Sequence, residues 1–553
     1  MKKTRFLRVC SLAIAVTLLV AALAGCGGGS ASRAPGNKDG NNGDNTGKAA
    51  GTLKLGIVDK GYGDEFLKKL AEGFEKKTGI KTVVEKSSSA DWVENAMQAG
   101  AANNDLDVIF DINPRAMKNL ATKDYVAGYD RIYVDLSDIY DAKLEGYTTD
   151  MTLKEALLPY SLTACTWGGD GEGYGDGKQY FVNWAAGIEG IVYNKALFEK
   201  YKLSVPKTTD ELFAVMDQMK KLEGGKYAKN SDGYEIYPFA YSGKVNYLNY
   251  PATVWWAQYD GIDVFNNALQ GKDANGNYSA ESAKTAGKLS AMNHVSQLLS
   301  ADNQYTDPNS ASQNFTNAQV LFLAEQSFMM STGDWIEREM SSNFEGSVEI
   351  EFMRIPVNSN ITSKCSSISN DAQLSEVVAY IDGDTSEKPA FVSEEDLAFV
   401  TSARSMYCSE GNQHIAYIPA YSNNIEAGKQ FLSYMLSKEG QEIVLEYSYG
   451  NMAPLNIDIA EFDYASSMSS LQKSKFELLN FNGGATLVGT NYVHPMNYAG
   501  GVELYNAKIT MEIAFGGVTT SATHLTPKQL WQRDYDKVAA DWNSKLSRAG
   551  VSN

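Results

Sequence analysis

The sequence predicts an α/β protein with two lobes. Residues 188–193 form a short apolar, β-branched run that predicts a buried strand, and a helical segment follows at once from Asn194. Residues 52–59 and 80–85 flank another helical segment in the same order. Alternation of strands and helices is typical of a parallel sheet covered by helices. A chain of 553 residues is also long enough for two hydrophobic cores.

The first residues predict export. Four positively charged residues precede an apolar run, residues 9–24, which is too short to span a bilayer and so predicts a signal peptide. The run ends in Leu-Ala-Gly-Cys at Cys26, which resembles the lipobox of bacterial lipoproteins and implies a lipid on that cysteine. Residues 27–51 hold little that can be buried, so we expect a disordered tether.

The overall charge argues against nucleic acid as a partner. The formal net charge is −18, and removal of the basic leader would make the chain still more acidic. Three cysteines remain beyond the leader and lipobox, Cys165, Cys365 and Cys408. We expect buried thiols, with a Cys365–Cys408 disulfide as the alternative, and no Cys or His spacing predicts a metal site.

The stretch from Gly187 to Lys221 carries a family resemblance. A strand, the phrase YNK, a helix, the helix-ending Pro206 and a second helix follow one another there. This order resembles the crossover of the extracellular solute-binding proteins of ABC importers, the family of maltose-binding protein. FEKKTGIKTVVE, residues 74–85, and an expected long helix over residues 427–447 also resemble that family.

The resemblance implies a two-lobed, periplasmic-binding-protein-like fold of type II. Two α/β lobes would close on a ligand by hinge motion. The expected hinge segments lie near residues 183–190, 341–350 and 449–454. The expected domains are a signal peptide (1–25), a lipidated tether (26–51), a first lobe (52–185 plus about 350–450) and a second lobe (186–349 plus about 451–545).

Aromatic residues dominate the candidate ligand site. A sugar offers apolar C–H faces that stack on aromatic rings and hydroxyl groups that need polar partners. The segment of residues 241–259 is rich in tyrosine and tryptophan, and residues 333–335 resemble the family's G-x-W turn. The aromatic candidates are Trp335, Trp255, Tyr250, Tyr247 and Trp184, each with core packing as the alternative. The candidates on loops after strands are Asp334, Asp59, Tyr62, Asp111 and Arg115.

We therefore expect a carbohydrate-binding lipoprotein of an ABC importer, not an enzyme. It would hand an oligosaccharide to a membrane permease, act as a monomer without a cofactor, and sit on the extracellular face of the cytoplasmic membrane of a Gram-positive bacterium. The sequence has no HExxH, GxSxG or Walker motif. The alternatives are a surface glycoside hydrolase or lyase, which needs two placed carboxylates, and a binding protein for a peptide, polyamine or ferric iron.

Overall fold

The structure is a computed structural model, and its description covers most of the chain beyond the tether. The described residues are 51–59, 61–89, 105–111, 132–168, 175–244, 247–342, 348–409, 414–489, 494–498 and 525–552. The described residues all belong to one compact unit, residues 50–553. The predicted signal peptide, Cys26 and nearly all of the tether lie outside them. Among the described helices, none has the length and apolar character needed to cross a membrane.

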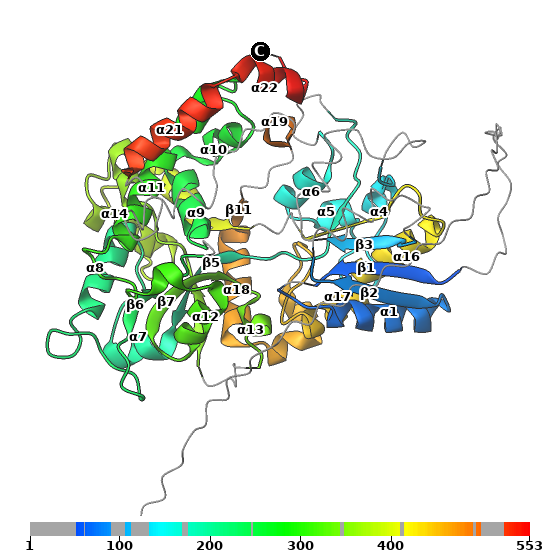
Figure 1. The fold of residues 1–553 in the computed structure, drawn as a ribbon, viewed down its shortest axis with the longest axis horizontal. Coiled ribbons are helices and arrows are strands. Elements are labelled where there is room, and N and C mark those ends of the chain that lie inside the picture. Colours follow the sequence, from blue (N-terminus) through cyan, green and yellow to red (C-terminus); the bar gives the residue numbers. More distant parts are fainter. Residues whose placement is uncertain are drawn as a thin grey trace, which may run out of the picture. The chain divides into compact units, whose positions relative to one another are not determined.

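The first lobe is built on a five-stranded sheet in the order β2-β1-β3-β10-β4 (Figure 1). Strands β1, β2 and β3 are parallel, and β10 runs antiparallel to both β3 and β4. The strands are β1 (Leu53–Val58), β2 (Thr82–Ser87), β3 (Val108–Asp111), β4 (Val182–Asn183) and β10 (Ile415–Tyr417).

Helices bury apolar faces against this sheet. Helix α1 (Glu65–Thr78) buries Phe66, Leu70 and Phe74 at helical spacing and ends at Gly79, whose φ of 75° suits a residue without Cβ. The others are α4 (Ser137–Asp141), α5 (Leu153–Ala156), α6 (Pro159–Cys165), α16 (Ile425–Leu436) and α17 (Lys438–Tyr447).

The expected single helix over residues 427–447 is two helices, α16 and α17. Ser437 lies between them with an extended ψ of 160°, and its side chain accepts a hydrogen bond from the Gly440 N–H. A serine that caps the second helix therefore interrupts a pattern that is otherwise continuous.

The second lobe is built on a six-stranded sheet in the order β11-β9-β5-β7-β6, with β8 also paired to β5. Strand β5 runs antiparallel to β7, β8 and β9, whereas β6 is parallel to β7 and β11 to β9. The strands are β5 (Glu189–Asn194), β6 (Tyr237–Ala240), β7 (Ser327–Gly333), β8 (Ile350–Met353), β9 (Met406–Cys408) and β11 (Thr486–Val488).

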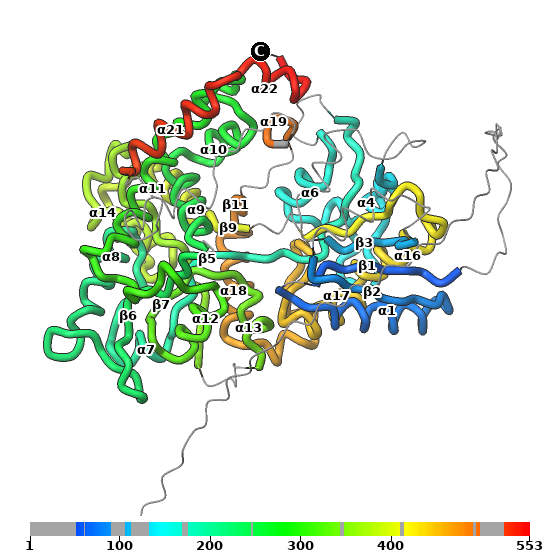
Figure 2. Tube along the Cα trace, viewed as in Figure 1, coloured from blue at the N-terminus to red at the C-terminus, as the bar shows by residue number. Residues whose placement is uncertain are grey.

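Most of the remaining helices lie beside or above this second sheet in the view of Figure 2. They are α7 (Lys195–Tyr201), α8 (Thr209–Met219), α9 (Asn249–Asp260), α10 (Ile262–Leu269), α11 (Ala286–Leu299), α12 (Phe315–Leu323), α13 (Ile336–Glu339), α18 (Ser470–Leu479), α19 (Pro495–Tyr498), α21 (Pro527–Ala539) and α22 (Trp542–Ala549). Helices α14 (Asp371–Ile381) and α15 (Glu394–Arg404) lie between β8 and β9 and form a small apolar cluster of their own.

Two of the expected lobe boundaries differ from the division of the sheets. Strands β8 and β9 pair with β5 in the second sheet, so residues 350–408 do not join the first lobe. Buried side chains between Met452 and Met468 pack in the first core rather than the second. The chain passes from the first sheet to the second between β4 and β5, back between β9 and β10, and to the second sheet again between β10 and β11.

Candidate functional site

The loop that follows β1 meets the turn that follows β7. The Tyr62 hydroxyl, almost fully buried, donates a hydrogen bond to the Asp334 carboxylate. A Cβ atom on Gly61 would lie 3.3 Å from Trp335 Cβ, and one on Gly63 would lie 2.7 Å from Arg338 Nη2. Three consecutive residues of the first lobe thus pack against a turn of the second. We call this contact, Gly61–Gly63 with Asp334, Trp335 and Arg338, the clasp.

A buried lysine completes the clasp. Lys475, on α18, forms an ion pair with Asp334, and the two side chains are 2% and 6% exposed. Its ammonium group also donates to Asn451 Oδ1 at 3.0 Å and to the Gly450 carbonyl at 3.4 Å. Because an isolated charge is costly to bury, the pair and its hydrogen bonds keep both charges stable here.

Burial also governs the titratable groups beside the clasp. It raises the pKa of Tyr62 far above its usual range, with the nearby Asp334 and Glu189 carboxylates adding to the effect. It lowers the pKa of His414 to about 3, helped by the charge of Lys475. The His414 ring lies 5.1 Å from that of Tyr62. His414 is therefore neutral at pH 7.

Three aromatic side chains gather at the Trp335 end of the clasp. The Tyr247 and Tyr250 rings stack with centroids 5.6 Å apart, and they lie 5.8 Å and 6.1 Å from the Trp335 ring. All three side chains are only partly buried. A Cβ on Gly333 would come within 2.2 Å of Trp335 Cζ3, so only glycine permits this ring position. The group offers the kind of apolar surface on which a sugar ring stacks.

Charged groups lie on the first-lobe side of the same region. Lys86, at the end of β2, is 3.0 Å from Asp59 and 3.3 Å from Asp64. Lys68 approaches Asp64 at 2.6 Å. The Asp59 side chain is 27% exposed and that of Lys86 is 50% exposed. Both can still offer hydrogen bonds to a ligand.

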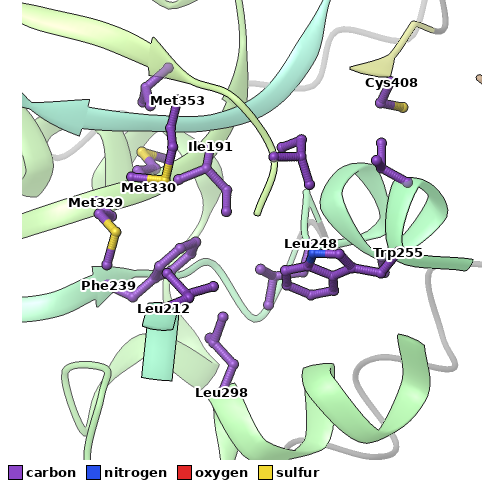
Figure 3. Close-up of a cluster of buried hydrophobic side chains, with 14 of the residues drawn as sticks. Ile191, Leu212, Phe239, Leu248, Trp255, Leu298, Met329, Met330, Met353 and Cys408 are labelled. Carbon is purple, nitrogen blue, oxygen red and sulfur yellow. The ribbon is translucent and has the colours of Figure 1, made fainter. Parts of the chain in front are cut away.

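Two predicted aromatic ligand contacts are wrong because their side chains are core residues. Trp255 is fully buried, its Nε1–H donates to the Pro356 carbonyl at 3.1 Å, and it lies among the apolar side chains of Figure 3. Trp184 is 1% exposed, stacks on Phe66 at 5.0 Å, and donates to the Asp111 carbonyl. Neither indole has surface for a ligand.

The remaining predicted polar residues divide similarly. Asp111 is 2% exposed, and the Tyr417 hydroxyl lies 3.4 Å from its carboxylate, so it belongs to the interior of the first lobe. Arg115 lies outside the described residues. Asp334 and Tyr62 occupy the buried base of the clasp, whereas Trp335, Tyr247, Tyr250 and Asp59 keep exposed surface.

Sequence reasoning did not identify Lys475, Lys86 or Arg338. Lys475 is 141 residues from its partner Asp334, on a helix without a motif. Lys86 follows an ordinary strand. Only Arg338 had a signal, since it follows the G-x-W turn by three residues and thus lies one helical turn further along.

The described residues contain no group of His, Cys, Asp and Glu side chains close enough to hold a metal ion. Cys165, Cys365 and Cys408 are free thiols, so the alternative of a Cys365–Cys408 disulfide is not realised.

Two α/β lobes, linked by chain segments that pass between their sheets and joined at an aromatic clasp, define the class of two-lobed binding proteins. The model of the bacterial extracellular solute-binding protein family matches residues 69–467, well over half of the sequence. The chain belongs to this family. It is therefore a solute-binding protein and not an enzyme.

Solved structures share the fold at low sequence identity. RafE in complex with raffinose is 17% identical, with a TM-score of 0.53, over 89% of this chain and 99% of that one. The substrate-binding protein Lmo0181 from Listeria monocytogenes, in complex with cycloalternan, is 15% identical, with a TM-score of 0.55 over 89% and 99%. The receptor AcbH, which prefers β-D-galactopyranose, is 13% identical, with a TM-score of 0.54 over 89% and 98%. A comparison with curated protein sequences gives no match.

Proposed function

We propose that the protein captures a carbohydrate, an oligosaccharide in particular, and delivers it to the permease of an ABC importer. The observation that carries this proposal is the partly exposed group of Trp335, Tyr247 and Tyr250 beside the clasp. Aromatic faces bind the apolar faces of sugar rings, and a stacked pair next to a perpendicular indole gives two such surfaces. Structural neighbours in complex with raffinose and cycloalternan support the same ligand class.

The residues of the proposed site have different roles. Trp335, Tyr250 and Tyr247 stack on the sugar, while Asp59 and Lys86 form hydrogen bonds with its hydroxyl groups. Asp334 and Tyr62 shape the base of the site, because their polar atoms are already engaged with each other and with Lys475. Hinge closure between the lobes then excludes water from the bound ligand.

The N-terminal leader supports a location for this activity at the cell membrane. A lipid on Cys26 would hold the protein at the extracellular face of the cytoplasmic membrane, since buried acyl chains supply the anchoring energy. The polar residues 27–51 would let the binding unit move about that anchor. Such an anchor would keep the loaded protein close to its permease.

The proposal is tested by ligand-induced thermal stabilisation of the purified protein. A ligand that binds only the folded state raises its melting temperature. We expect a shift with raffinose or with xylo-oligosaccharides of three or more units. Trp335→Ala should abolish the shift without unfolding the protein, and the matched variant Tyr234→Ala, at a tyrosine that is 59% exposed, should retain it.

Two results would overturn the proposal. One is an unchanged shift in Trp335→Ala, which removes this residue from the site. The other is stabilisation by a peptide, a polyamine or ferric iron and by none of the sugars, which replaces the ligand class.

A further inference from the structure

A pocket lies between elements of both lobes and shares no residue with the clasp. Its volume is about 520 Å³, and its walls come from α6, α10, β11 and the glycines before β11. We call it the edge pocket. Its size falls in the range of sites that bind small molecules.

One wall of the edge pocket is the free edge of a sheet. In the described part of the chain, β11 is the last strand of its sheet and pairs only with β9. The Thr486 N–H bonds to Ser405, and the Val488 carbonyl accepts from Ser409. Because alternate residues of a strand direct their backbone groups to opposite sides, the N–H and carbonyl of Leu487 face away from β9. Leu487 itself lines the pocket.

Three polar side chains of the pocket have no hydrogen-bond partner among the described residues. Asn266 on α10, Asn456 and Thr163 on α6 line it, and their side chains make no hydrogen bond to any described residue. Asn266 and Thr163 are partly buried and Asn456 is exposed. The partly buried ring of Tyr160 adds an aromatic wall. Amides, a hydroxyl and an aromatic face are thus available together.

No charged side chain is found among the described lining residues, although the chain has 67 acidic and 49 basic residues. An ion that entered this pocket would lose water without gaining an opposite charge, which is costly. The chemistry therefore selects an uncharged ligand with hydroxyl groups.

We propose that the edge pocket is a second binding site, for an uncharged hydroxylated molecule of mono- or disaccharide size. Asn266, Asn456 and the Leu487 backbone provide its hydrogen bonds, and Tyr160 provides its apolar face. The site is independent of the aromatic group at Trp335. Its ligand contacts both lobes, because α6 belongs to the first core and β11 to the second.

The test uses the full-length protein carrying Trp335→Ala. In this variant, binding at the proposed sugar site does not contribute to the measured thermal shift. The probes are glucose, galactose, xylose and maltose, with the anion gluconate as the charged comparison. We expect at least one neutral sugar to raise the melting temperature and gluconate to have no effect. No shift with any neutral sugar, or a shift with gluconate alone, would overturn the proposal.

Two further variants locate the effect. Ala164→Trp places an indole in the pocket and should remove the shift, whereas Ala196→Trp, at an exposed position on α7, should keep it. Asn266→Ala should weaken the affinity roughly fivefold, the effect of one neutral hydrogen bond, even if Ala164→Trp fails to fold. If the thermal shift is unchanged in both Ala164→Trp and Asn266→Ala, the ligand does not bind in the edge pocket.

Amide hydrogen exchange provides a local measurement. The ligand should slow exchange at Leu487, whose N–H faces away from β9, in the Ala196→Trp protein but not in the Ala164→Trp protein. If acetyl-trialanine amide slows that exchange and no sugar does, the pocket takes an extended peptide by strand addition, and the proposal is wrong.

Discussion

The clasp and the edge pocket join elements of the same two lobes with opposite chemistry. The clasp contains a buried Asp334–Lys475 ion pair that reaches Tyr62 of the other lobe. The edge pocket has no charged lining residue among those described, and its amides at Asn266 and Asn456 have no hydrogen-bond partner in the same part of the chain. In the clasp the polar groups bind one another, whereas in the edge pocket they can bind solvent or a ligand.

This difference shows that one interface between the lobes can hold a fixed arrangement while another stays open to water or a ligand. A buried ion pair is strongly destabilising when one partner is lost, so it favours a single arrangement of the groups that make it. Uncharged groups that face a hollow cost little when water satisfies them. The ion pair of the clasp should therefore contribute strongly to stability, whereas the polar groups of the edge pocket should contribute little to it.

The largest expected effect breaks the clasp. Lys475→Met leaves the Asp334 carboxylate buried without its cation, so the free energy of unfolding should fall by about 3–5 kcal/mol. Urea denaturation monitored by circular dichroism measures this change. Lys475→Met combined with Asp334→Asn should recover most of the loss, because no charge is then left unpaired.

A matched lysine provides the control for that experiment. Lys86→Met removes a cation from a half-exposed pair and should lower the free energy of unfolding by less than about 1 kcal/mol. If the two lysine variants have equal effects, burial of the clasp does not matter for stability.

The sequence predicted the elements that carry the aromatic group but not all of its members. Trp335 follows a recognisable strand and turn, and Tyr247 and Tyr250 lie in an aromatic segment, so the three could be proposed together. Trp255 failed because it lies five residues after Tyr250 on α9, a rotation of about 140° that turns it toward the core. Composition alone cannot distinguish the two faces of a helix that is buried on nearly all sides.

The clasp and the lobe boundaries needed three-dimensional information. Asp334 and Lys475 are brought together by packing between distant segments, and no local pattern relates them. Strands β8 and β9 are apolar runs like those of either sheet, so the sequence could not decide which sheet they join. The edge pocket arises from the end of a sheet and a helix of the other lobe, which also have no shared motif.

An intermediate effect appears on the acid side of neutrality. The pKa of His414 is about 3 in the folded protein and near 6.5 when exposed, so the unfolded chain binds the extra proton. Its contribution to stability is complete above pH 6.5 and is lost as the pH falls toward 3. Protonation of His414 in the unfolded chain should lower the free energy of unfolding by about 2 kcal/mol between pH 6.5 and pH 5.

The variant His414→Gln isolates the pH-dependent contribution of His414 to the free energy of unfolding. Urea denaturation at pH 7 and pH 5 should show a smaller loss of stability in the variant than in the parent protein, whatever the stability of the variant at pH 7. His494, whose pKa burial also lowers to about 3, remains in both proteins and gives a common background. Equal losses in the two proteins would mean that His414 is protonated before the chain unfolds.

The smallest expected effect concerns the edge pocket without ligand. Asn266→Ala removes an amide that no described residue engages, and alanine favours a helix more than asparagine does. The free energy of unfolding should therefore stay within about 0.5 kcal/mol of the parent value, with any change toward greater stability. Urea denaturation of the unliganded protein measures it under the conditions used for Lys475→Met. A loss of more than about 1 kcal/mol would show that Asn266 supports the fold, and the contrast between the two regions would then disappear.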